Sequence, residues 1–261
     1  MTANDGDLVV SVTNFRPTRE GPEADLEKVI VGQLPGLFPF ESKHQPVWAA
    51  SSVPVGAGIP DLVIVSCQPH VVALANVEFR STEILAYLRV VTCARFATIV
   101  ERINQSKRKT DRQLMELVEV DAVREKSGVF SLSPAWRDVL PEIITIEAKV
   151  DNWRIAINQA ARNRIFAHRS YVALPERVAT RIRNEQAFSQ LGLGLLSVSA
   201  EEEIKIIRRG RRHHPRVWSY YYRLAALLAS DFDGAGNQLG GEWRTSFPSR
   251  KRAKASRNTN L

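Results

Sequence analysis

The spacing of apolar residues predicts a helix near the start of the chain. Within 22–34 the large apolar residues lie three or four positions apart, the spacing of one buried helical face. Pro22 suits the first turn, and we expect the helix to stop before Pro35. The short apolar run Leu8–Val12 that precedes it is typical of a loose arm or an edge strand.

Further along the chain, continuous apolar runs are typical of strands buried on both faces. Strands are expected at 47–50, 61–65, 143–150, 170–174, 191–198 and 204–207. Helical spacing of apolar residues predicts helices at 153–167, 176–190 and 216–230. This alternation of strands and helices indicates an α/β protein with a mixed sheet flanked by helices.

Residues 81–137 have a different pattern. Helical spacing occurs over 81–91, over 93–103 with Thr92 as a cap, and again from Ser106 onward. A turn and a short strand at 129–132 follow. Three helices and a small hairpin are the order of a winged helix-turn-helix, a fold that binds DNA.

This pattern divides the chain into three parts. Residues 81–137 are expected to form an inserted winged-helix unit. Residues 1–80 and 138–233 would form the core into which it is inserted. The segment 234–261 is basic and rich in Gly, Ser and Asn, so we expect it to be a disordered tail.

The amino-acid composition indicates which kind of partner the protein binds. The 261 residues include 36 Lys and Arg against 28 Asp and Glu, and the net charge of +8 favours nucleic acid first and an anionic membrane second. No apolar run approaches the ~20 residues of a membrane span, and Met1–Asp7 lack the basic cluster of a secretory signal. Cys67 and Cys93 form no CxxC pair. We therefore expect a cytoplasmic protein with reduced thiols and no membrane partner.

Two short motifs place charged side chains at the ends of apolar strands. Pro60-Asp61 leads into one strand, and Glu147-Ala148-Lys149 ends another. If the strands are neighbours, Asp61 and Glu147 could hold Mg²⁺, with Mn²⁺ as an alternative, and the Ala148 carbonyl could be a further ligand. Lys149 shares a face with Glu147. It could orient a water molecule or, if burial lowers its pKa, act on the water proton, which suits hydrolysis of a phosphodiester.

These motifs resemble those of the PD-(D/E)XK nuclease superfamily, which includes type II restriction enzymes and archaeal Holliday junction resolvases. The matching residues are Pro60-Asp61 and Glu147-x-Lys149, and the resemblance covers 22–80 and 141–200. It implies a restriction-endonuclease-like mixed sheet flanked by helices and Mg-dependent hydrolysis of DNA.

The resemblance also implies two supporting residues. Glu27 lies on the first predicted helix, where members often carry an acid that reaches the metal site. Gln159 lies on the helix after Lys149, where many members have a glutamine that points at the site. Asp61 and Glu147 are 86 positions apart, more than in a minimal core of this family, so 81–137 must loop out.

The basic residues also have structural interpretations. Lys107, Arg108, Lys109 and Arg112 lie at the start of the third helical pattern, and we predict that they contact DNA. A solvated charged face is the ordinary role of such a run. The run 208–214 is expected to be a basic surface loop, and Glu23 to stabilise the N-terminus of its helix.

The sequence thus predicts a Mg-dependent DNA endonuclease that acts in restriction, defence or repair. A homodimer is compatible with this prediction. A non-catalytic DNA-binding protein with a nuclease-like scaffold is the main alternative. A nuclease directed at RNA is the second, and the winged-helix pattern weakens it.

Overall fold

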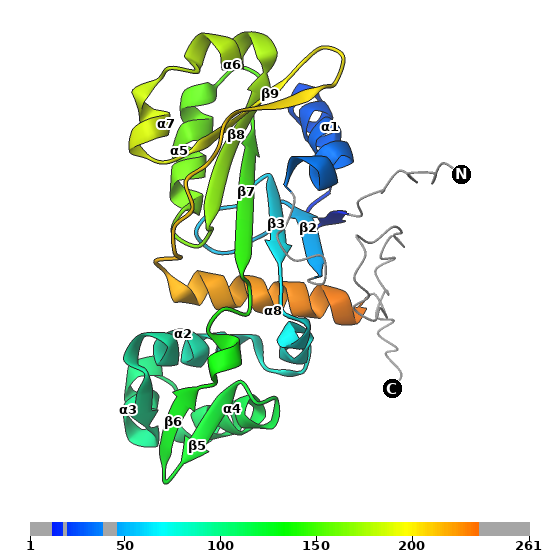
Figure 1. The fold of residues 1–261 in the computed structure, drawn as a ribbon. Coiled ribbons are helices and arrows are strands. Elements are labelled where there is room, and N and C mark those ends of the chain that lie inside the picture. The colour runs from blue at the N-terminus through cyan, green and yellow to red at the C-terminus, as the bar shows by residue number, and fades with distance from the viewer. Residues whose placement is uncertain (1–11, 18–19, 39–45, 235–261) are drawn as a thin grey trace, which may run out of the picture.

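One seven-stranded sheet forms the centre of the part described by this computed structural model, residues 12–17, 20–38 and 46–234. Its strand order is β1-β2-β3-β7-β8-β9-β10 (Figure 1). The strands are β1 (Val12–Asn14), β2 (Val47–Ser51), β3 (Leu62–Ser66), β7 (Glu142–Ala148), β8 (Arg169–Pro175), β9 (Gly194–Val198) and β10 (Ile204–Arg208). The pairs β1/β2, β7/β8 and β8/β9 are parallel and the others antiparallel. The predicted mixed sheet is therefore confirmed, and β1 and β10 are its edge strands.

Helices cover both faces of this sheet (Figure 1). They are α1 (Pro22–Leu37), α5 (Trp153–Asn163), α6 (Glu176–Ile182), α7 (Gln186–Gln190) and α8 (Trp218–Gly234). The apolar stripe of α1 packs on Leu62 and Ile146 at one face, whereas α5, α6 and α7 pack on the opposite face of β8 and β9. None of the described helices is both long and apolar enough to cross a bilayer.

Helix boundaries differ from the prediction in several places, including α8, which runs four residues further than expected. α1 does not stop before Pro35 but continues to Leu37, because Leu34, Leu37 and Phe38 are all buried and tertiary packing outweighs the missing backbone hydrogen bond. α5 ends at Asn163, earlier than expected. The helix predicted over 176–190 is two helices, α6 and α7.

The segment between β3 and β7 forms a smaller layer of its own at one end of the sheet (Figure 1). After the 3₁₀ turns η1 (Pro69–Asn76) and η2 (Phe79–Ser81), its elements are α2 (Thr82–Val91), β4 (Cys93–Arg95), α3 (Phe96–Ile103), α4 (Lys107–Glu119), β5 (Val123–Lys126), β6 (Val129–Leu132) and η3 (Pro134–Trp136). The strands form an antiparallel sheet in the order β4-β6-β5. Cys93 to Arg95 is therefore a strand and not the first turn of a helix.

α8 lies between the two sheets and joins them (Figure 1). Buried residues form one continuous apolar cluster from Val63 in the large sheet through α8 to Leu85 in α2. Two buried tyrosines of α8 also anchor the returning chain: the Tyr222 hydroxyl donates to the Trp136 carbonyl at 2.9 Å, and the Tyr221 hydroxyl accepts from the Leu140 amide at 2.7 Å. The inserted segment thus shares a core with the main sheet. The basic tail was predicted to start at Gly234, which the structure instead places at the end of α8. The remainder, 235–261, lies outside the described residues, as does most of the run Leu8–Val12.

A buried histidine makes the fold sensitive to acid. His168 is buried, and its Nδ1 accepts a hydrogen bond from the Ile143 amide at 3.0 Å. Burial, followed by the charges of Arg212, His214 and His213, lowers the pKa of His168 to about 3. An unfolded histidine titrates near ~6.5. Because the unfolded chain takes up this proton first, the contribution of neutral His168 is fully present above pH ~6.5 and is lost as pH falls toward 3.

We therefore expect the urea midpoint to fall steadily from pH 6.5 downward, and His168→Gln to make that dependence shallower. Some slope should remain, because burial and nearby Arg164 also lower the pKa of His213, to about 4. Equal slopes for His168→Gln and the unchanged protein, measured by urea melts at several pH values, would contradict this assignment.

Candidate active site

The two charged motifs meet because β3 and β7 are antiparallel neighbours. Leu62 pairs with Ile146, so the next residues, Asp61 and Glu147, lie opposite each other at the end of the strand pair. Leu62 and Ile146 pack beneath α1. Because side chains alternate along strands, Glu147 points away from the α1 side of β7, and Asp61 directly precedes β3 beside it. The structure thus brings the two acids together despite the 86 positions between them.

Lys149 joins this pair from just beyond the end of β7. Its Nζ donates hydrogen bonds to Asp61 Oδ2 and Glu23 Oε2, both at 3.2 Å, and to the Ala148 carbonyl at 2.9 Å. The Ala148 amide donates to Asp61 Oδ2 at 2.9 Å. The carbonyl predicted as a metal ligand therefore already accepts a hydrogen bond, and Glu23 has a second role besides stabilising the start of α1.

Glu147 is the most buried acid of the group, with 1% of its surface exposed. Asn163 at the end of α5 donates to its Oε1 at 2.6 Å, whereas Oε2 is buried and accepts no hydrogen bond from the described residues. Burial, followed by the charge of Asp61, raises the pKa of Glu147 to about 8. Two neighbouring carboxylates, one with a buried oxygen lacking a donor, are what a divalent cation would stabilise in the ionised form.

The structure does not support the hypothesis that burial lowers the pKa of Lys149 so that it can act on a water proton. Burial acts to lower the pKa of this ammonium, but the carboxylates of Asp61 and Glu23 outweigh burial and raise it above its ordinary value. A lysine in this state keeps its proton at neutral pH. The arrangement therefore favours Lys149 as a fixed positive charge over Lys149 as a proton acceptor.

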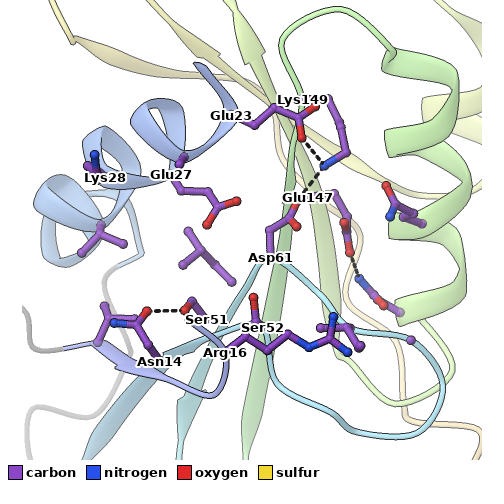
Figure 2. Close-up of a pocket in the computed structure, with 18 of the residues that line it drawn as sticks. Asn14, Arg16, Glu23, Glu27, Lys28, Ser51, Ser52, Asp61, Glu147 and Lys149 are labelled. Carbon is purple, nitrogen blue, oxygen red and sulfur yellow. Dashed lines mark hydrogen bonds and ion pairs between the residues drawn. The ribbon is translucent and has the colours of Figure 1, made fainter. Parts of the chain in front are cut away.

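These residues line a cavity of about 660 Å³ between α1, the ends of β1 and β3, and α5. Figure 2 shows Glu27 pointing from α1 toward Asp61. Gln159 lines the same cavity from α5, and its Oε1 is buried without a partner among the described residues. Both residues implied by the resemblance are thus at the cavity, and Gln159 has an acceptor available to a bound group.

Several polar residues of the cavity were not predicted as part of the site. Asn163 lies four positions after Gln159 and Glu23 four before Glu27, so helical spacing places each beside a predicted residue and could have indicated it. Arg16 and Arg162 also line the cavity. No sequence signal distinguishes these two from other surface arginines.

The predicted DNA-contacting residues lie at the start of α4, where the Ser106 side chain caps the helix by accepting from the Lys109 amide. Lys107 and Arg108 are exposed there. Lys109 and Arg112 instead form ion pairs with Glu78, at 2.9 and 2.6 Å. Hydrogen bonding to Lys109 is the largest influence on Glu78 and lowers its pKa to about 2. Half of the predicted basic set is therefore neutralised within the protein.

No group of three or more His, Cys, Asp or Glu side chains suited to a metal ion occurs within 12–17, 20–38 and 46–234. Asp61 and Glu147 are a pair, so backbone, water and substrate oxygens would have to complete a coordination shell there. Compared with known proteins, the chain matches no protein-family model, no curated protein and no solved structure.

Proposed function

We propose that this protein is a metal-dependent endonuclease that hydrolyses phosphodiester bonds in DNA. One observation carries the proposal. Asp61, directly before β3, and Glu147, in the neighbouring strand β7, line one cavity, and the Lys149 ammonium lies 3.2 Å from Asp61. Paired carboxylates that can hold a metal ion, together with a fixed cation, are groups that suit phosphodiester hydrolysis.

Asp61 and Glu147 would hold Mg²⁺, or Mn²⁺ in its place. Bound there, the metal would polarise the phosphate and lower the pKa of a water molecule. Asn163 orients Glu147 by donating to one of its oxygens. Lys149, charged and held by two carboxylates, stabilises the negative charge that develops on the phosphate. Glu27 and Gln159 offer further oxygen atoms from the two walls of the cavity.

The segment from η2 to η3 supports DNA as the substrate. Its order α2-β4-α3-α4-β5-β6, with a three-stranded sheet β4-β6-β5, is compatible with a winged helix. Winged-helix units are a variant of the helix-turn-helix, which binds duplex DNA. The mixed sheet with helices on both faces is compatible in turn with a restriction-endonuclease-like core.

The test is incubation of the purified protein with supercoiled plasmid, linear duplex DNA, branched DNA and duplex RNA. Each substrate is assayed with Mg²⁺, with Mn²⁺ and with EDTA. We expect nicking or linearisation of at least one DNA with either metal, none with EDTA, and no cleavage by Asp61→Asn. Cleavage of RNA alone would favour the RNA-directed alternative. DNA binding without cleavage under every condition would favour a non-catalytic scaffold.

A further inference from the structure

Three arginines gather where α5 ends and α8 begins. We call Arg164, Arg211 and Arg216 the arginine cluster. Arg164 directly follows α5, and the other two lie in the loop between β10 and α8. A Cβ at Gly192 would lie 3.2 Å from Arg211 Cβ and 3.7 Å from Arg164 Nη2, so both arginines sit over this glycine.

The backbone holds the arginine cluster in place. The Arg211 amide donates to the Gly192 carbonyl at 2.9 Å, and the Arg216 amide donates to the Ile165 carbonyl at 2.8 Å. Arg164 is half-buried, and its Nε donates to His213 Nε2 at 2.8 Å, which orients the guanidinium. Hydrogen bonds therefore fix the backbone of Arg211 and Arg216 and the guanidinium of Arg164.

The charge of the arginine cluster is not compensated by an acid from the described part of the chain. None of the ion pairs found among the described residues includes Arg164, Arg211 or Arg216. Burial, followed by the charges of Arg216 and Arg211, lowers the pKa of Arg164. Like charges held together in this way repel one another, and a bound anion would relieve the repulsion.

Other basic residues differ in this respect. Lys109 and Arg112 on α4 are paired with Glu78. Arg169 and Arg212, close to the arginine cluster in the chain, are both paired with Glu142, at 3.1 and 2.9 Å. The arginine cluster is thus a place where positive charge is available to a partner from outside the chain.

The cluster also adjoins the candidate active site through α5. Arg162 lines the cavity, Asn163 donates to Glu147, and Arg164 is the next residue. Arg162, at the cavity, and Arg164, in the arginine cluster, are only two residues apart. A polyanion bound at the cavity next to Arg162 can therefore also contact the arginine cluster. Guanidinium groups bind phosphate oxygens through paired hydrogen bonds, and Arg211 and Arg216 are exposed and can do so.

We propose that the arginine cluster binds backbone phosphates of the DNA strand that flanks the cut. The choice of DNA as partner rests on the proposed function. Contacts to phosphates position the duplex without reading its sequence. In this arrangement the duplex spans the surface from the cavity to the loop before α8, and the start of α4 is not its main source of affinity.

The test compares Arg211→Gln/Arg216→Gln with the unchanged protein. This double variant keeps the hydrogen bond between Arg164 and His213. A matched control, Arg177→Gln/Arg181→Gln, removes two exposed charges from α6, at the far end of the sheet (Figure 1). Binding to a fluorescein-labelled DNA duplex of about 30 base pairs is followed by anisotropy in EDTA over a series of salt concentrations, with a duplex RNA of the same length in parallel.

We expect the double variant to bind DNA about tenfold more weakly at low salt. Its salt slope should be smaller by about two units, because two phosphates are no longer neutralised and each accounts for about one unit. The control should keep most of its affinity and slope. The proposal is overturned if the two double variants behave alike, if the unchanged protein does not bind DNA, or if it prefers the RNA duplex. Because EDTA prevents metal-dependent cleavage, absence of nuclease activity would overturn the proposed function and leave this binding result intact.

Discussion

Replacing Lys149 with alanine is expected to reduce DNA cleavage about 100- to 1,000-fold, the usual effect of removing one group that stabilises charge in a transition state. DNA affinity should change little, because Lys149 is mostly buried and contacts Asp61 and Glu23. Cleavage is measured by plasmid nicking at saturating Mg²⁺, and affinity by anisotropy in EDTA. A selective loss of cleavage would identify Lys149 as part of the chemistry.

Lys28 provides the matched control for this experiment. It lines the same cavity from α1, but its side chain is exposed and pairs with Asp25 on its own helix. Lys28→Ala should keep cleavage within a few-fold of the unchanged protein. A thermal melt of each variant shows whether the fold is intact. Wild-type cleavage by Lys149→Ala would reject the role assigned to this residue.

Gly194→Ala is expected to destabilise the fold by about 3 kcal/mol or more, at the upper end of the cost of overpacking. A Cβ at this position would lie 2.1 Å from Tyr171 Cδ1 and 2.9 Å from the Gly210 backbone nitrogen. The Tyr171 ring is buried and packs edge-on against Phe38, with centroids 5.1 Å apart, so it has little room to move. The measurement is the urea midpoint together with the melting temperature.

Gly32→Ala is the natural comparison, because Gly32 lies within α1 and a Cβ there would meet nothing within 4 Å. Alanine favours helix over glycine by about 1 kcal/mol, so this variant should be more stable than the unchanged protein. Opposite signs for the two substitutions are the expected result. A Gly194→Ala protein as stable as the unchanged chain would show that β8 and β9 can separate enough to admit a methyl group.

Much of the main sheet could be predicted from sequence because its strands are continuous apolar runs with clear ends. β3 and β7 are examples, and their buried interiors follow directly from Leu62–Ser66 and from the isoleucines of β7. Periodicity did not predict that Asp61 and Glu147 lie together. That prediction came from the resemblance, which implies that their strands are neighbours. Periodicity alone carries no information on which strands pair.

Other features depend on tertiary contacts that periodicity does not report. α1 continues past Pro35 because apolar residues beyond it are buried. The pairing of Lys109 with Glu78 joins residues 31 positions apart on different elements, so the run that includes Lys109 resembles a free basic surface in the sequence. The hydrogen bond from Asn163 to Glu147 could not be predicted either, because it forms only when α5 packs beside β7.

The position of α8 has a consequence for how the chain matures during synthesis. Its buried tyrosines close the link between the two sheets, and its Asp231 accepts hydrogen bonds from Thr13 in β1 at 2.7 Å and from Trp48 in β2 at 2.9 Å. These contacts of β1 and β2 can therefore form only after α8, the last described helix, has left the ribosome. Until then the nascent chain exposes apolar surface that α8 later covers, and chaperones have their greatest opportunity to bind in that interval.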